Sequence, residues 1–153
     1  MTRAKNDITQ SKKSLGNKEK GSYVLLIGLS TEQTIVIGRL NTVQFPRGYY
    51  AYVGSAMRGF GARLNRHLRK DKKLHWHIDK LLQRAAITSI ILCETEDRTE
   101  CIIARAFSRQ FDAVLGFGCS DCKCRSHLFF AVEEMKQEIM VILDSLGMTP
   151  RLA

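Results

Sequence analysis

The chain has 153 residues and a formal charge of +9, from 24 basic and 15 acidic side chains. This length fits one domain, and a content of 44% hydrophobic residues with 2 prolines supplies a core and excludes a disordered or fibrous chain. The apolar runs are far shorter than the ~20 residues that cross a bilayer, and no apolar export signal opens the chain. We therefore expect a cytoplasmic protein with no membrane partner, whose positive charge attracts polyanions, nucleic acid first among them.

The first 20 residues differ in composition from the rest. They contain six basic and two acidic residues and almost no apolar ones, so burial would not offset the entropy lost on ordering them. We expect a flexible basic arm over 1–20 and one folded domain over 21–153. The domain keeps an excess of five positive charges, so it is basic in its own right.

The first half of the domain begins with strand patterns. Runs of β-branched and large apolar residues predict strands over 23–29 and 34–37, and the short turn between them predicts a hairpin. A turn at 45–48 precedes a third strand over 49–54. Apolar residues then recur every four positions, which predicts a helix over 59–70.

The second half is expected to alternate helices with strands. A short helix is predicted over 75–84 and a continuous apolar strand over 87–93. Thr99 stands where it can cap a helix from Glu100 to about Phe111. After a loop rich in glycine and cysteine, the pattern predicts a final strand over 127–132 and a final helix over 133–146.

Positive charge is densest between Arg58 and Lys73, where seven basic residues are opposed only by Asp71. Such a patch can neutralise several phosphates and makes binding depend on salt, although a solvated helical face is the alternative. Tyr50 and Tyr52 lie on one face of a strand, where phenols can bond a phosphate or stack on a base, or can simply pack. The candidate nucleic-acid-binding residues are Arg58, Arg66, Arg69, Lys70, Lys72 and Lys73.

Four features occur in an order that resembles the GIY-YIG nuclease superfamily. Gly21-Ser22-Tyr23 opens one strand, Tyr52-Val53-Gly54 closes another, Arg63 lies on the next helix and Glu100 begins a later one. Longer strings resemble a little-characterised branch of that superfamily, a domain of unknown function sometimes fused to helix-hairpin-helix DNA glycosylases. These strings are GYYAYVGSA, RHL, HWHID and GFGCSDC, and the resemblance covers about residues 21–130.

The resemblance implies an α+β fold, with a small, mainly antiparallel central sheet and flanking helices. It also implies hydrolysis of a phosphodiester bond, in DNA rather than RNA, with one Mg²⁺ or Mn²⁺ ion. Tyr23 or Tyr52 would position or deprotonate the attacking water, and Arg63 would stabilise charge on the phosphate. Glu100 would hold the metal, and His67 would supply a second donor or a proton.

Elementary chemistry is consistent with these roles. One carboxylate and the phosphate oxygens can hold Mg²⁺, which keeps most of its waters, and a guanidinium pairs with phosphate through two bonds. Taken without the resemblance, Arg63 and His67 are ordinary helix-surface groups and Glu100 is a first-turn glutamate.

Two features depart from the superfamily pattern. An extra hairpin, roughly over 34–44, separates the two tyrosines, and the late asparagine of many members has no counterpart. A catalytically inactive nucleic-acid-binding module is therefore the alternative function.

Five cysteines, an odd number unevenly spaced, do not form the framework of a disulfide-rich domain. Cys119, Cys122, Cys124 and His127 could bind structural zinc, which would suit an interaction domain for an acidic protein partner. Four ligands within nine residues are unusually compact, so we expect free thiols and a locally bonded histidine instead.

His75 and Asp79 share a face of the helix expected over 75–84. If the segment were a strand instead, His75, His77 and Asp79 would lie on one face and could bind a metal together. On a helix His77 points away, so we expect His75 and Asp79 to bond to each other.

Overall fold

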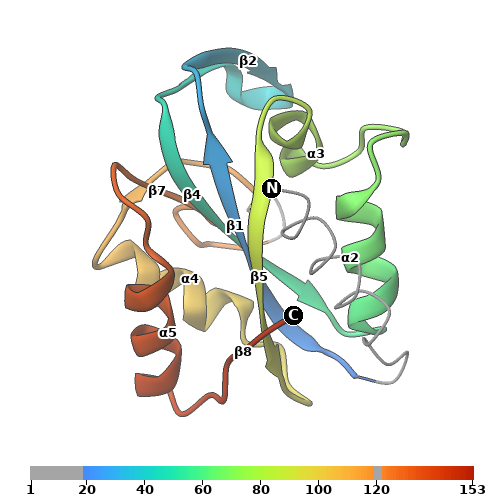
Figure 1. Cartoon of the computed structure of the whole chain (residues 1–153), viewed down its shortest axis with the longest axis vertical. Helices are drawn as coiled ribbons and strands as arrows, with labels where there is room; N and C mark the ends of the chain where they lie inside the picture. Colours follow the sequence, from blue (N-terminus) through green and yellow to red (C-terminus); the bar gives the residue numbers. More distant parts are fainter. Residues whose placement is uncertain (1–18, 119–121) are drawn as a thin grey trace.

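A six-stranded antiparallel sheet organises the fold, with strand order β6-β7-β4-β1-β5-β8 (Figure 1). The computed structural model describes residues 19–118 and 122–153. The predicted α+β class and the mainly antiparallel central sheet are confirmed. The central sheet and a separate two-stranded sheet contain β1 (Gly21–Leu29), β2 (Gln33–Ile37), β3 (Asn41–Phe45), β4 (Gly48–Ala56), β5 (Ala86–Glu94), β6 (Asp112–Ala113), β7 (Leu128–Ala131) and β8 (Arg151–Leu152).

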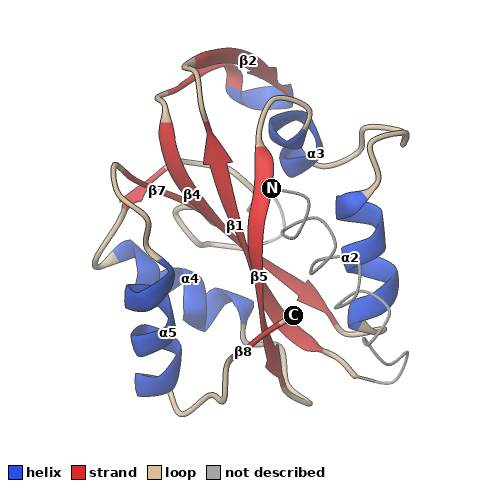
Figure 2. Cartoon of the chain, viewed as in Figure 1, coloured by secondary structure: helices blue, strands red, loops and turns tan. Residues whose placement is uncertain are grey.

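Four α-helices flank the sheet in the described part of the chain, two on each face (Figure 2). None of them is long and apolar enough to cross a membrane. A 3₁₀ turn over Gly38–Leu40 joins β2 to β3. The helices are α2 (Phe60–Leu68), α3 (His77–Leu82), α4 (Glu100–Ser108) and α5 (Lys136–Ser145).

Strand β1 is buried on both faces, which explains its unbroken apolar run. Tyr23 and Leu25 belong to the core under α2, α3 and the β2–β3 hairpin. Val24 and Leu26 belong to the core under α4 and α5. Successive side chains of a strand point to opposite faces, so a central strand covered on both sides needs apolar residues at every position.

The predicted pairing of the first two strands is wrong, although both strands exist. β1 pairs with β4 and β5, whereas β2 pairs with β3, with Thr34 opposite Gln44. β1 has nine residues, as do β4 and β5, so these two strands can satisfy its backbone along its length where the five residues of β2 cannot. The β2–β3 pair is the extra hairpin that was expected roughly over 34–44.

The remaining predicted elements agree with the structure apart from their ends, whereas the two-residue strand β6 was not predicted. Helix α4 stops at Ser108, before the expected end at Phe111, and the N–H groups of Arg109 and Gln110 bond carbonyls three residues back. The strand over 127–132 is not the last one, since β8 follows it and pairs with β5.

The end of the predicted arm is attached to the domain. The carbonyl of Glu19 accepts a bond from the N–H of Phe60, and the carbonyl of Lys20 accepts one from Thr95. The Glu19 carboxylate also pairs with Arg151. The rest of the arm lies outside the described residues.

Tyr23 lies directly over Gly54 of the neighbouring strand. The two residues are opposite each other in the β1–β4 pair, and a Cβ on Gly54 would stand 2.3 Å from Cζ of Tyr23. Gly21 has φ +150°, and a Cβ there would stand 2.1 Å from the carbonyl oxygen of Cys93. Both glycines of the two tripeptides are therefore required by the packing.

We expect Gly54→Ala to lower the free energy of unfolding by about 1–3 kcal/mol, because the new methyl group must displace a buried phenol ring. Gly28→Ala is the matched control, since its Cβ would meet only the Thr88 Cγ2 atom at 3.4 Å. Urea unfolding of both variants measures the difference. In a Tyr23→Ala background, Gly54→Ala should be less destabilising, and equal effects in the two backgrounds would contradict the contact.

Candidate active site

A cleft of about 340 Å³ opens beside the end of β4. β4 continues past Tyr52, where its strand pairing with β7 stops, and Gly54 and Ser55 beyond that point form one wall. Helix α2, the segment before α3 and the start of α4 supply other parts of the lining. The side chains used below that line the cleft are Tyr52, Ser55, Arg63, Trp76 and Glu100. Three of the five predicted catalytic residues thus meet in one cleft.

Tyr23 and His67, the other two, lie next to the cleft but are not part of its lining. The Tyr23 hydroxyl and the His67 Nε2 atom are 2.6 Å apart, and the two residues are only 1% and 3% exposed. Burial, helped by the charge of Lys72, lowers the pKa of His67 to about 3. Burial also raises the pKa of Tyr23 above its usual value. The bond therefore joins two neutral groups at physiological pH, and the neutral imidazole can accept a hydrogen bond from the phenol.

The Tyr52 hydroxyl is influenced by both charged residues of the cleft. Burial raises its pKa, the Glu100 carboxylate raises it further, and the Arg63 guanidinium lowers it. Arg63 acts in the same direction on the pKa of Tyr23. A protonated phenol, a guanidinium and a carboxylate are thus close enough to influence one another across the cleft.

Trp76 holds two arginines against its ring. The Cζ atoms of Arg63 and Arg66 lie 4.7 Å and 4.1 Å from the ring centroid. The fully buried carboxylate of Asp79 accepts bonds of 2.7 Å and 2.9 Å from Arg66, and one of 2.8 Å from the backbone N–H of Trp76. Burial opposes ionisation of Asp79, but these bonds outweigh it and lower its pKa. The roles of Trp76 and Asp79 in holding the arginines were not predicted. The HWHID string, which contains both residues, was the feature of the sequence that pointed to this segment.

The predicted side-chain bond between His75 and Asp79 is wrong. The bond to Asp79 comes from the backbone N–H of His75, at 2.8 Å. Helix α3 begins only at His77, so His75 does not lie on its face. His77 instead accepts a bond at Nδ1 from the N–H of Gly118.

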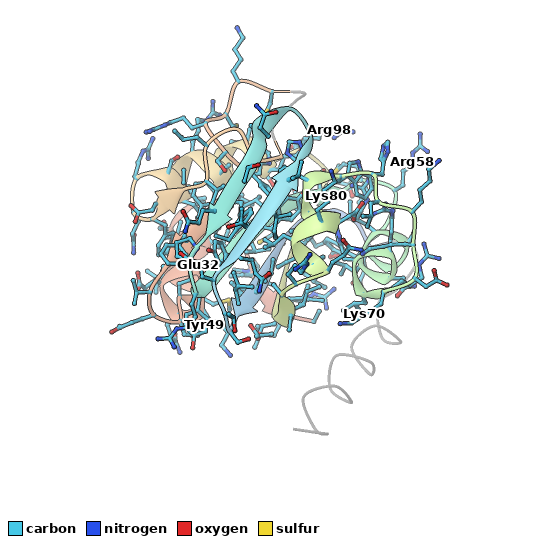
Figure 3. The ribbon with its side chains drawn as sticks, turned by 90° about the horizontal axis from the view of Figure 1, so that it is seen from above. Glu32, Tyr49, Arg58, Lys70, Lys80 and Arg98 are labelled. Carbon is cyan, nitrogen blue, oxygen red and sulfur yellow. The ribbon has the colours of Figure 1, made fainter. Side chains whose placement is uncertain are left out.

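Two of the residues predicted to bind nucleic acid use their side chains for bonds within the protein, and the Arg66 side chain is 20% exposed. Besides its bonds to Asp79, Arg66 bonds the carbonyl of Lys73. The side chain of Lys72 is 5% exposed, and its Nζ bonds the carbonyls of Arg66 and His67. The four that are exposed are Arg58, Arg69, Lys70 and Lys73. Figure 3 shows Arg58 and Lys70 at the rim of the molecule, beside the green ribbon of α2. The exposed basic surface is therefore smaller than the charge density suggested.

Glu100 stands between the cleft and a group of soft ligands. Its Oε2 atom lies 3.9 Å from His127 Nδ1. The ligand atoms of Cys101, Cys122, Cys124 and His127 all lie within 4.8 Å of one another. Three of these belong to the predicted cluster, whose fourth member, Cys119, lies outside the described residues. Cys101 was not predicted, because only the packing of α4 brings it to the loop.

We expect the free energy of unfolding to fall as the pH is lowered from about 6.5 towards 3, with His67 contributing about 1.4 kcal/mol for each pH unit. Folded His67 stays neutral until about pH 3, whereas the unfolded chain takes up the proton near the ordinary value of 6.5. The stability is thus present above the unfolded pKa and is lost as the pH falls. Urea unfolding at pH 7.5, 6 and 5 measures the slope. His67→Gln should make it shallower, and an unchanged slope would contradict a buried neutral imidazole.

Comparison with known proteins identifies the family of the chain. No curated protein and no solved structure matches it. A family model described as "Domain of unknown function DUF123" matches residues 22–148, which is most of the chain and includes every residue of the cleft. The chain therefore belongs to the DUF123 family.

Proposed function

We propose that the protein is a divalent-metal-dependent endonuclease that hydrolyses phosphodiester bonds, with DNA as the favoured substrate. One observation carries the proposal: Tyr52, Arg63 and Glu100, from three separate elements, line the same cleft. A phenol, a guanidinium and a carboxylate are suited to orient a water, pair with a phosphate and hold a hard cation. The resemblance of the two tripeptides to the GIY-YIG superfamily supports the same chemistry.

The cleft has the donors and the space for a phosphate and a hydrated cation. Glu100 supplies an anionic oxygen, and about 340 Å³ leaves room for several waters. Mg²⁺ or Mn²⁺, when bound, would neutralise charge on the phosphate and make a water more acidic. The buried hydroxyl of Ser55 has no hydrogen-bond partner among the described residues, so it is available to a ligand.

Each residue of the chain has a separate task in this proposal. Arg63 is held in place by Trp76 and presents its guanidinium to the phosphate. We assign water positioning to Tyr52 rather than Tyr23, because Tyr52 lines the cleft. Tyr23 and His67 support the site from its buried side through their hydrogen bond.

Glu100→Gln should reduce cleavage about 100-fold or more, a barrier increase of about 2.7 kcal/mol, while leaving nucleic-acid binding intact. The amide keeps the size of the side chain but loses the negative charge that holds the cation. The assay incubates labelled single-stranded, duplex, flapped and junction DNA with protein in Mg²⁺, Mn²⁺ or EDTA. Glu133→Gln, at an exposed position, is the control.

The outcomes separate enzyme from binding module. Cleavage that needs metal and is lost only in Glu100→Gln supports the nuclease. An unchanged rate in Glu100→Gln would show that the glutamate is misassigned. Binding without cleavage on every substrate would favour the non-catalytic nucleic-acid-binding module.

Replacing Lys70 and Lys73 together by Gln should reduce the salt dependence of duplex binding. Each lost phosphate contact lowers the slope of log K against log salt by about 0.9, so we expect a change of about 1.8. Fluorescence anisotropy across a salt series measures the slope. Arg105→Gln with Lys136→Gln, on the helices of the opposite face, is the matched control. Equal slopes in the two double variants would show that DNA does not contact the segment that follows α2.

A further inference from the structure

We propose that Cys101, Cys122, Cys124 and His127 together bind one structural zinc ion. The site differs from the cluster that the sequence suggested, because Cys101 on α4 takes the place of Cys119 in the ligand set. It is also separate from the proposed catalytic cation, since its donors are sulfur and nitrogen rather than oxygen. Three thiolates and one imidazole form a common donor set of structural zinc sites.

The four ligand atoms are close enough together to reach one ion after a small adjustment. They lie within 4.8 Å of one another. In a tetrahedron with Zn–S bonds of about 2.3 Å, neighbouring ligand atoms are about 3.8 Å apart. A contraction of about 1 Å or less would therefore bring all four to bonding distance of one ion.

His127 is oriented as a metal ligand. Its Nδ1 atom lies 3.3 Å from the carbonyl oxygen of Val53, and its Nε2 atom lies 3.3 Å from the Sγ atom of Cys122. A bond from Nδ1–H to a carbonyl leaves the lone pair on Nε2, which is the atom that faces the cysteines. Ligating histidines in zinc sites are held in this way by a second partner.

The grouping is not explained by packing of free thiols. Cys93 shows what such a residue looks like here: it is buried in the core among apolar side chains. The three clustered cysteines are instead partly exposed and come from α4 and from the loop before β7. A disulfide would use two of them and would leave the third, and the imidazole, without a role.

The ion would fix the start of α4, which has no side-chain capping bond in the structure. The hydroxyl of Thr99, the residue at the cap position, bonds Ser22 instead. Cys101 directly follows Glu100, so a metal bond at Cys101 would restrain the first turn and its carboxylate. This consequence for Glu100 rests on the proposed nuclease function, whereas the zinc site itself does not.

The first test is metal analysis of protein expressed with added zinc and purified without tags or chelators. We expect one zinc ion per chain, lost to background in Cys101→Ser and Cys124→Ser. Cys93→Ala and Cys119→Ser are the matched controls and should keep their zinc. Zinc-free wild-type protein would overturn the proposal, and so would loss of zinc in Cys119→Ser with retention in Cys101→Ser.

A second measurement does not depend on the folding of serine variants. Zinc is removed from the full wild-type chain, which is then titrated with Co²⁺. Visible absorption spectra are recorded to detect the bands of Co²⁺ in tetrahedral thiolate coordination. His127→Cys should retain zinc, because it conserves the number of soft ligands. Absence of the cobalt bands would overturn the site.

The zinc proposal and the nuclease proposal can be refuted independently of each other. Stoichiometric zinc in a protein that cuts no DNA would support the zinc site and refute the nuclease. Cleavage by zinc-free protein whose unfolding temperature is not raised by added zinc would refute the zinc site and support the nuclease.

Discussion

Tyr23 crosses the bare backbone of Gly54 to reach His67, and the geometry of the cleft depends on that contact. Because Gly54 has no side chain, the phenol of β1 passes over β4 and comes within 2.6 Å of the imidazole on α2. Two strands and a helix are thereby held in one arrangement. Arg63 lies one helical turn before His67, so the same contact places its guanidinium at the cleft.

Two of the seven basic residues between Arg58 and Lys73 serve the fold. Asp79 is completely buried, and a buried carboxylate is tolerated only when cations and N–H groups surround it. Arg66 and Lys72 meet this need, and Arg66 also stacks on Trp76, which holds Arg63. A count of basic residues therefore overstates the surface left for a polyanion, since part of the charge compensates an internal anion.

The two proposed metal sites would share the start of α4 without competing for the same ion. Glu100 offers a carboxylate oxygen, which suits Mg²⁺, whereas the neighbouring Cys101 offers a thiolate, which suits zinc. His127 lies between them, with Nε2 towards a cysteine and Nδ1 near the Glu100 carboxylate. The donor chemistry separates the sites even though the residues are adjacent in the chain.

The local pattern of the sequence was enough to determine most elements, because strand and helix periodicities depend on neighbouring residues. It also indicated Tyr52, Arg63 and Glu100 as site residues through the resemblance of short motifs. Only the tertiary structure decided that β1 pairs with β4 and β5, that Trp76 stacks on Arg63, and that Cys101 joins the cysteines of the loop. These contacts depend on the packing of separate elements against one another, which no local pattern encodes.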